Sequence, residues 1–208
     1  MKGTVFSVAL NHRSQLDAWD QAFRSAPYQT PPKTPVWFIK PRNTHLTNGG
    51  SIPFPAGEVV QSGATLAVVI GSLARKVPAE KVAEYVAGYA LANDVSLPET
   101  SFYRPAIKAK CRDGFCPLGE IAPLSSTDNL EIVTEINGVE QDRWSTADLV
   151  RSVPELIAAI SDFITLQPGD AVLIGTPHQR VEIKPGDEVT VRAAGLPTLN
   201  NRVTQAGE

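Results

Sequence analysis

The segment Leu66-Ala67-Val68-Val69-Ile70, followed by Gly71, is a continuous apolar run that ends at a glycine. Such runs are typical of buried strands. A second strand signal comes from Leu130–Ile136, where apolar and polar residues alternate until the pair Asn137-Gly138. This pair favours a two-residue turn, so we expect a β-hairpin that returns through Val139.

Other segments extend this β-rich pattern outward from the apolar run. Thr4–Leu10 is typical of a strand. Two Pro-Gly-Asp turns, Pro168–Asp170 and Pro185–Asp187, are each expected to precede a further strand. The strands expected after these turns are Ala171–Ile174 and Glu188–Arg192. Many strands and few helices predict an α+β, mainly β fold.

Three segments carry helical signals, and one long segment carries none. Ser14 is the expected cap of a short helix that reaches Phe23, and Pro78 is expected in the first turn of a helix that continues to Tyr89. Ser152 and Glu155 form a capping box for a helix expected to end near Leu166. Residues 26–57, rich in Pro and Gly, are expected to form long ordered loops.

Composition limits the classes of protein to consider. The 208 residues are 42% hydrophobic, which is enough for one core, so a single domain over residues 1–208 is expected. A net charge of -3, with both signs spread along the chain, favours small-molecule or protein partners over nucleic acid or membrane. The sequence has no apolar run of about 20 residues, which predicts a cytoplasmic protein. Cys111 and Cys116 lack metal-site spacing and are expected to be reduced thiols.

The strongest chemical signal is a group of charged residues between Asn93 and Gly119. The sequence has no P-loop, GxSxG or HExxH motif, so the common nucleotide and hydrolase signatures are missing. The segment can be a solvated loop or a site for an anionic substrate, because Arg and Lys bind carboxylates and stabilise enolates. Its charged and phenolic side chains include Asp94, Tyr103, Arg104, Lys108, Lys110, Arg112 and Asp113.

Four segments, in this order, resemble signatures of the fumarylacetoacetate hydrolase superfamily. They are Leu66–Gly71 (LAVVIG), Tyr85–Tyr89 (YVAGY) with Asn93-Asp94, Lys110–Gly119 (KCRDGFCPLG), and Pro168–Asp170 with Gly175-Thr176-Pro177. The segments Leu10–Ser14 (LNHRS), Tyr103–Pro105 (YRP) and KCRDGFCP further resemble the N-terminal-type half of the family's bifunctional decarboxylase/isomerases. The resemblance implies a mixed β-roll with peripheral helices.

The resemblance also implies a chemistry. It implies a divalent ion, Mg²⁺ or Mn²⁺, that chelates a 2-oxo acid, and a pocket that stabilises a dienolate. Loss of CO₂ from 5-carboxymethyl-2-oxo-hex-3-ene-1,7-dioate gives such a dienolate, and protonation at another carbon gives the isomerised product. The implied protein partner is a metal-binding paralogous subunit. Family members commonly associate through their sheets, so a homodimer or a heterodimer is expected.

This sequence departs from the family pattern at the expected metal ligands and at the acid/base pair. Gly63 and Thr65 stand where the family has carboxylates, which leaves Asp94 as the candidate ligand, and one Asp with a Thr hydroxyl should bind Mg²⁺ poorly. Gln15 and Ala18 replace the family's His and Glu, and Gln cannot shuttle protons at neutral pH. His12 is one candidate substitute, and a structural histidine is the alternative.

The candidate site residues follow from these matches. Lys110 matches the family's site lysine and is the catalytic candidate, with a surface lysine as the alternative. Three readings stay open: a catalytic subunit of a heteromeric decarboxylase/isomerase, a degenerate partner that supports a metal-binding paralogue, and another 2-oxo-acid hydrolase. The substrate-binding candidates are Tyr103, Arg104, Arg112, Asp113 and Thr176. The alternative role for the two arginines is to form internal salt bridges. The alternative for Thr176 is a purely structural role in the Gly-Thr-Pro turn.

Overall fold

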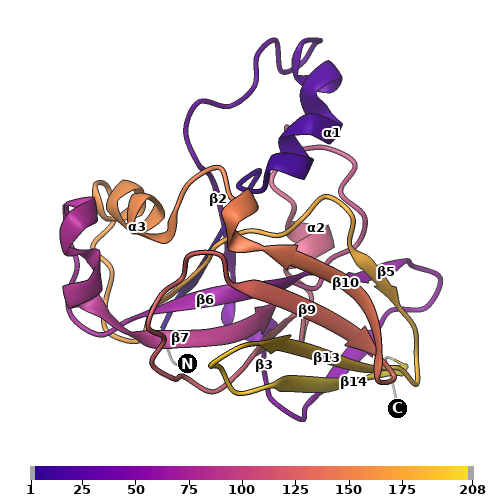
Figure 1. Cartoon of the computed structure of the whole chain (residues 1–208). Coiled ribbons are helices and arrows are strands. Elements are labelled where there is room, and N and C mark those ends of the chain that lie inside the picture. Colours follow the sequence, from indigo (N-terminus) through magenta and orange to yellow (C-terminus); the bar gives the residue numbers. More distant parts are fainter. Residues whose placement is uncertain (1–2, 206–208) are drawn as a thin grey trace.

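A computed structural model describes residues 3–205, which form two curled β-sheets, a two-stranded ribbon and short peripheral helices (Figure 1). The larger sheet is built around the predicted apolar run Leu66–Ile70, which forms the C-terminal part of strand β6, Ala64–Ile70. All seven residues of β6 are buried because both faces of the sheet are covered. The order of strands is β2 (Val36–Lys40), β1 (Val5–Ala9), β11 (Ala171–Leu173), β6, β7 (Val86–Asn93), β8 (Cys116–Leu118) and β3 (His45–Thr47).

The second sheet contains the predicted hairpin. Asn137 and Gly138 both have positive φ angles, 53° and 79°, as a two-residue turn of the primed type requires. The order of its strands is β10 (Val139–Ser145), β9 (Glu131–Ile136), β13 (Glu188–Ala193), β14 (Leu199–Gln205) and β4 (Ser51–Phe54). The separate ribbon pairs β12 (Val181–Ile183) with β5 (Val60–Ser62).

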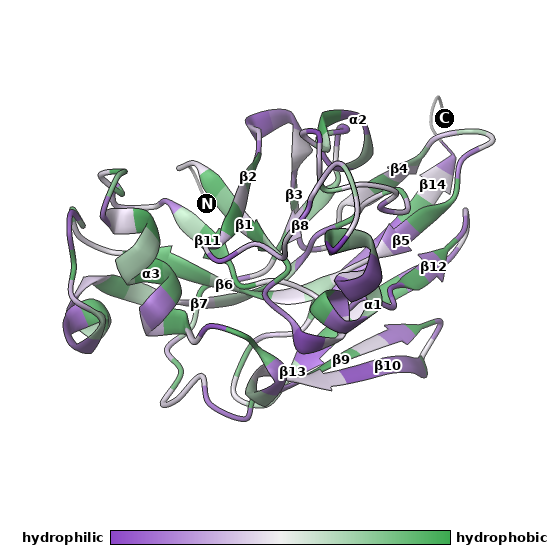
Figure 2. Cartoon of the chain, turned by 90° about the horizontal axis from the view of Figure 1, so that it is seen from above, coloured by the Kyte–Doolittle hydropathy of each residue, from purple (hydrophilic) through white to green (hydrophobic). Residues whose placement is uncertain are grey.

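The main core lies where the two sheets face each other. Leu66 and Val68 of β6 pack in one cluster with Ile132 of β9 and Val191 of β13. The intervening residues of β6 belong to a second cluster on the other face of the sheet, since successive strand side chains point in opposite directions. Figure 2 shows the result, with apolar inner strands and a mainly polar outer strand β10.

The helices lie at the edges of the sheets. Two of the expected boundaries are wrong: the N-cap of α1 is His12 and not Ser14, and α3 ends at Ser161 and not near Leu166. Leu166 instead exchanges backbone hydrogen bonds with Ala74. The helices are α1 (Arg13–Phe23), α2 (Ile107–Lys110), α3 (Val153–Ser161) and the 3-10 turns η1 (Arg42–Thr44), η2 (Ala79–Tyr85) and η3 (Thr146–Asp148).

The helix expected between Pro78 and Tyr89 is also wrong in its second half. The 3-10 helix η2 ends at Tyr85, and the chain then enters β7. Pairing with β6 explains the change, because strand β7 completes the hydrogen bonds of a central buried strand. Residues 26–57, expected to be loops, likewise contain the short strands β2, β3 and β4, which pair with partners distant in sequence.

These elements bring four chain segments to one place. Strand β2 ends at Lys40, β7 ends at Asn93, α2 ends at Lys110, and Arg180 comes directly before β12.

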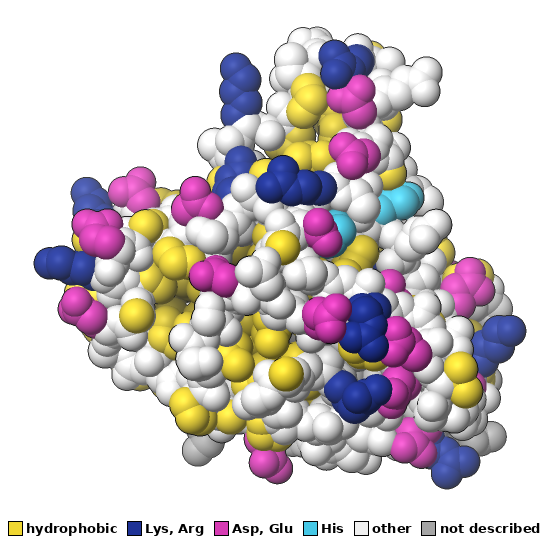
Figure 3. Space-filling view, in the orientation of Figure 1, with side chains coloured by type: hydrophobic (Ala, Val, Ile, Leu, Met, Phe, Trp, Pro, Cys, Tyr) yellow, Lys and Arg dark blue, Asp and Glu magenta, His cyan; other side chains and the backbone are white. Residues whose placement is uncertain are grey.

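Figure 3 shows basic and acidic side chains interspersed on the face it draws. Within residues 3–205, no helix has the length and apolar character needed to cross a membrane.

Candidate functional site

Asp94, the first residue after β7, is buried at the centre of a group of ion pairs. Its carboxylate accepts hydrogen bonds from Lys40 Nζ at 2.9 Å on Oδ1, and from Lys110 Nζ at 3.0 Å and Arg180 Nη2 at 3.1 Å on Oδ2. Burial alone would raise the pKa of Asp94, but Lys110, Lys40 and Arg180 hold it well below its usual value. Asp94 is therefore ionised and fully engaged with side-chain cations.

Lys40 is also held by backbone groups. Its Nζ donates to the carbonyl of Lys110 at 2.6 Å and to the carbonyl of Val95 at 3.1 Å. Burial lowers the pKa of Lys40, and Asp94 opposes this effect. With all three ammonium protons engaged, Lys40 ties β2 to the segment after β7 and to the end of α2.

Glu99 provides the second carboxylate of the group. Its Oε1 lies 2.8 Å from Lys110 Nζ and 3.8 Å from Arg180 Nη2, and its Oε2 accepts from Gln15 Nε2 at 3.4 Å. Burial would raise the pKa of Glu99, but Lys110 and Arg180 lower it below its usual value. We call Lys40, Asp94, Glu99, Lys110 and Arg180 the charge cluster, which holds three cations and two anions.

The residues at the expected metal position do not fit a divalent ion. Gly63 has no side chain, and the Thr65 hydroxyl is engaged with the Gly175 carbonyl at 2.6 Å. Asp94 is the sole carboxylate of the expected ligand set, and three cations already surround it. A divalent ion needs several anionic or neutral oxygens and would meet strong repulsion here.

The positions of the expected acid/base pair carry other roles. Gln15 is buried and accepts a hydrogen bond from the backbone N–H of Leu10 at 2.9 Å, while Ala18 is exposed. His12 caps α1: its Nδ1 accepts from the Ser14 N–H at 3.2 Å, and its ring lies edge-on to Trp144 at 5.5 Å. These contacts are structural, as in the alternative interpretation of His12 as a structural histidine.

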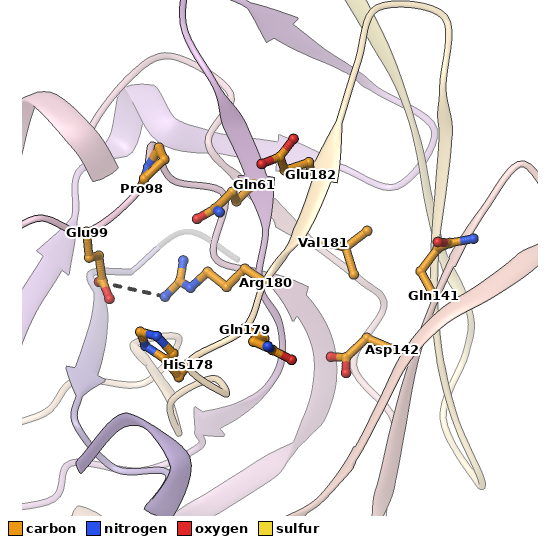
Figure 4. Close-up of a pocket in the computed structure, with 10 residues that line it drawn as sticks. All are labelled: Gln61, Pro98, Glu99, Gln141, Asp142, His178, Gln179, Arg180, Val181 and Glu182. Atoms are coloured by element: carbon orange, nitrogen blue, oxygen red, sulfur yellow. Dashed lines mark ion pairs between the residues drawn. The ribbon is translucent and has the colours of Figure 1, made fainter. Parts of the chain in front are cut away.

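Two cavities meet at the charge cluster. The first, of about 620 Å³, is lined by Arg180, Gln61 and His178, and Figure 4 shows Arg180 pointing across it to Glu99. The second, of about 450 Å³, is mainly apolar and has Lys110 in its wall. Glu99 lines both cavities, and its Oε1 lies near the cation of each, Lys110 in one and Arg180 in the other.

The structure brings some of the predicted site residues together. Lys110 is buried and not a surface lysine, and Tyr103 and Arg104 line the same cavity. Thr176 is buried beside Asp94, where its hydroxyl accepts from Arg180 Nη2 at 2.8 Å. Contact of these residues with a substrate stays a prediction.

Arg112 and Asp113 lie elsewhere, in the wall of a small separate cavity. Arg112 Nη2 pairs with Glu58 at 2.9 Å, as in the salt-bridge alternative. Asp113 accepts from Asn43 Nδ2 at 2.7 Å. Both side chains are therefore engaged away from the charge cluster.

Sequence reasoning missed three members of the charge cluster. Lys40 follows an apolar run, Glu99 follows a proline, and Arg180 comes shortly after the Gly-Thr-Pro turn. The proximity of Arg180 to that turn was the one available signal. The pairing of Lys40 with Asp94 depends on the sheet and left no local pattern.

Comparisons with known proteins agree with this architecture. A family described as "Fumarylacetoacetate (FAA) hydrolase C-terminal" matches residues 4–204. The 4-hydroxyphenylacetate degradation bifunctional isomerase/decarboxylase of Escherichia coli is 65% identical over the whole chain, which spans 48% of that relative. Correspondence to the N-terminal half of such relatives stays a prediction.

Solved structures give the same result for the fold. A 5-carboxymethyl-2-hydroxymuconate delta-isomerase from Mycobacterium smegmatis is 32% identical, with a TM-score of 0.84 over 99% of this chain and 80% of its own. A fumarylpyruvate hydrolase from Pseudomonas aeruginosa, solved with Mn²⁺ and pyruvate, is 24% identical, with a TM-score of 0.80 over 97% of this chain and 89% of its own. The mainly β fold that the sequence predicted is confirmed, and the chain belongs to the fumarylacetoacetate hydrolase family.

Proposed function

We propose that this chain is a subunit of an isomerase/decarboxylase of 4-hydroxyphenylacetate breakdown, and that it works with a metal-binding paralogous partner. The 65% identity to the Escherichia coli enzyme supports the reaction class. The chain spans about half the length of that relative, and the proposed partner corresponds to the half that this chain does not cover. The substrates are 5-carboxymethyl-2-oxo-hex-3-ene-1,7-dioate and 2-hydroxyhepta-2,4-diene-1,7-dioate.

The proposed chemistry passes through one dienolate. The bond between the departing carboxylate and its carbon breaks, CO₂ leaves, and the electron pair delocalises onto the 2-oxo oxygen. A positive charge beside that oxygen stabilises the dienolate. Protonation at a different carbon then shifts the double bonds, so one pocket serves both decarboxylation and isomerisation.

The proposed roles of this chain and its partner follow from the contacts of Asp94. Three cations engage this carboxylate, and the two positions beside it lack carboxylates. Gln15 and Ala18 offer no group that exchanges protons at neutral pH. We therefore assign metal-dependent activation and proton transfer to the partner, and a supporting role to this chain.

A second candidate role is direct contact of Lys110 with substrate. Lys110 Nζ lies in the wall of the mainly apolar cavity, 4.9 Å from the centre of the Phe38 ring. A substrate carboxylate that displaced Glu99 would meet Lys110 and the nearby Arg104. Because Lys110 is already paired with two carboxylates, this role requires Glu99 to move.

The test compares the chain alone, the partner alone and their mixture, with Mg²⁺ present and CO₂ release as the readout. We expect turnover by the chain alone to be negligible and the mixture to be more active than the partner alone. Full activity of the isolated chain would sink the partner proposal. A mixture no more active than the partner would contradict the supporting role.

The variant Lys110→Ala separates the two roles once circular dichroism shows that it folds. Loss of a charged hydrogen bond to substrate should lower kcat/KM of the mixture by about tenfold or more, equivalent to about 1.4 kcal/mol. Lys108→Ala, an exposed lysine on the same short helix, is the matched control. Unchanged kcat/KM in an intact Lys110→Ala mixture would exclude substrate contact and leave the supporting role.

A further inference from the structure

We propose that the guanidinium of Arg180 is a built-in replacement for a divalent ion at Asp94, and that Gly63 is the residue that makes room for it. The inference concerns the cation at this centre. It holds whichever reaction the assembled protein catalyses, and its test needs no turnover.

The oxygens that surround Arg180 are those a bound ion would use. Arg180 Nη2 donates to the Asp94 carboxylate at 3.1 Å and to the Thr176 hydroxyl at 2.8 Å, while Nη1 donates to the Asp94 carbonyl at 2.9 Å. A carboxylate, a hydroxyl and a carbonyl are hard oxygen ligands of the kind that Mg²⁺ and Mn²⁺ prefer. Here a planar guanidinium engages all three through directed hydrogen bonds.

Gly63 lies against both this guanidinium and the Asp94 backbone, and neither leaves room for a side chain at position 63. A Cβ built on Gly63 would lie 3.0 Å from Arg180 Nη1, 3.1 Å from Thr176 Cγ2 and 2.7 Å from the Asp94 carbonyl oxygen. A glutamate at position 63 would extend further into the space that the guanidinium fills. A ligand carboxylate at position 63 would therefore compete with the guanidinium for this space, and it would also require the Asp94 backbone to shift.

The charge of the cluster leads to the same conclusion. Three cations face two carboxylates, so the cluster carries one excess positive charge. A divalent ion would raise that excess to three in a buried site, where repulsion is stronger than in water. If glutamates replaced Gly63 and Thr65 and alanine replaced Arg180, four carboxylates would face two lysines, and one divalent ion would restore neutrality.

The replacement makes the cation permanent. Only 5% of the Arg180 side chain is exposed. Burial lowers the pKa of Arg180, but Glu99 and Asp94 outweigh this effect and raise it. A guanidinium does not exchange with solvent as an ion does, so chelators cannot remove it and pH changes do not discharge it.

The test titrates Mn²⁺ into the intact chain and follows free Mn²⁺ by electron paramagnetic resonance. Four proteins are compared: wild type, Arg180→Ala, the double variant Gly63→Glu/Thr65→Glu, and the triple variant with Arg180→Ala added. We expect no saturable binding by wild type. We expect the triple variant to bind Mn²⁺ at least tenfold more tightly than the double variant.

Two results would overturn the proposal. One is saturable Mn²⁺ binding by wild type that Asp94→Asn weakens. The other is equal affinity of the double and triple variants, which would mean that Arg180 does not compete with the ion.

Because a Cβ at position 63 approaches the Asp94 backbone closely, the glutamate variants need a second arm if they fail to fold. That arm uses Arg180→Ala alone and measures recovery of its Tm by about 20 mM guanidinium against equal NaCl, since a ligand that binds the native state raises Tm. The control is Arg112→Ala, which removes a more exposed arginine. Recovery confined to Arg180→Ala supports the proposal, and equal responses of both variants contradict it.

Discussion

Asp94 and Lys110 were visible as candidates because each lies in a recognisable segment, but their partners were not. Lys40 contacts Asp94 across 54 positions of sequence, and that contact exists only because β2 and β7 belong to one sheet. A residue's type and neighbours predict that it is charged. They do not predict which opposite charge the fold will place beside it.

The same distinction applies to Gly63. The sequence indicated that a carboxylate was missing at this position, and the structure adds what fills the space. Arg180 lies beside the space where a side chain at position 63 would begin, although the two residues are far apart in sequence. Arg112 illustrates the opposite case, in which a predicted substrate clamp is engaged in a salt bridge with Glu58.

His12 provides a prediction for pH dependence. Burial lowers its pKa below the ordinary 6.5, while Asp148 opposes this effect, and Nδ1 must stay unprotonated to accept the Ser14 N–H. The unfolded chain therefore binds this proton more readily. The stability that His12 contributes is present above about pH 6.5 and is lost as pH falls through the lower folded pKa.

Urea unfolding between about pH 7 and pH 5 measures this effect. In the wild type, protonation of His12 removes the cap, and we expect this to lower the free energy of unfolding by about 1 kcal/mol. His12→Asn keeps a cap acceptor that does not titrate, so we expect its free energy of unfolding to vary less with pH. His178→Asn, which changes an exposed histidine, is the control. An unchanged slope in His12→Asn would show that the cap is not the pH-sensitive group.

At the scale of elements, local signals succeeded where a turn or a cap decided the structure. Asn137-Gly138 gave the hairpin, and Ser152 with Glu155 formed the predicted capping box of α3. They failed between Val86 and Tyr89, where helical spacing of apolar residues was outweighed by pairing with β6. An amphipathic segment beside a buried strand can satisfy more backbone hydrogen bonds as a strand than as a helix end.

The hairpin gives a prediction about backbone strain. Gly138 has a φ of 79°, and a Cβ added there would meet nothing within 4 Å. The cost of Gly138→Ala is therefore conformational, and we expect a loss of about 1 to 2 kcal/mol in the free energy of unfolding. Gly138→Asn is the matched control, since Asn tolerates positive φ better. A larger loss for Asn than for Ala, measured by urea unfolding, would contradict this account.

At the scale of the whole molecule, the fold class followed from many strand signals, while the arrangement of strands did not. Parallel pairs such as β1 with β11 and β14 with β4 join distant segments, and neither partner carries a signal for the other. The charge cluster arises from this arrangement. The buried ion pairs of the cluster join segments that are distant in sequence, so a change in their charge is expected to change the stability of the complete fold.

That connection predicts how the protein responds to acid. The pKa values of Asp94 and Glu99 both lie below their usual values of 3.8 and 4.5, because the cluster cations outweigh burial. Below about pH 4.5 the unfolded chain takes up protons that the native carboxylates resist. The stability contributed by these carboxylates is therefore present above that pH and is lost as pH falls through their folded pKa values.

Glu99→Gln isolates one of the two carboxylates. We expect this variant to be less stable than wild type at neutral pH, since Lys110 and Arg180 lose a charged partner, and to approach wild type near about pH 3.5. The control is Glu140→Gln, whose ion pair with Arg143 is exposed. Salt at about 0.5 M should abolish the effect of the exposed pair but not that of the buried one. Urea unfolding at both pH values checks the result, and a Glu99→Gln difference that does not shrink on acidification would mean that the cluster does not control acid stability.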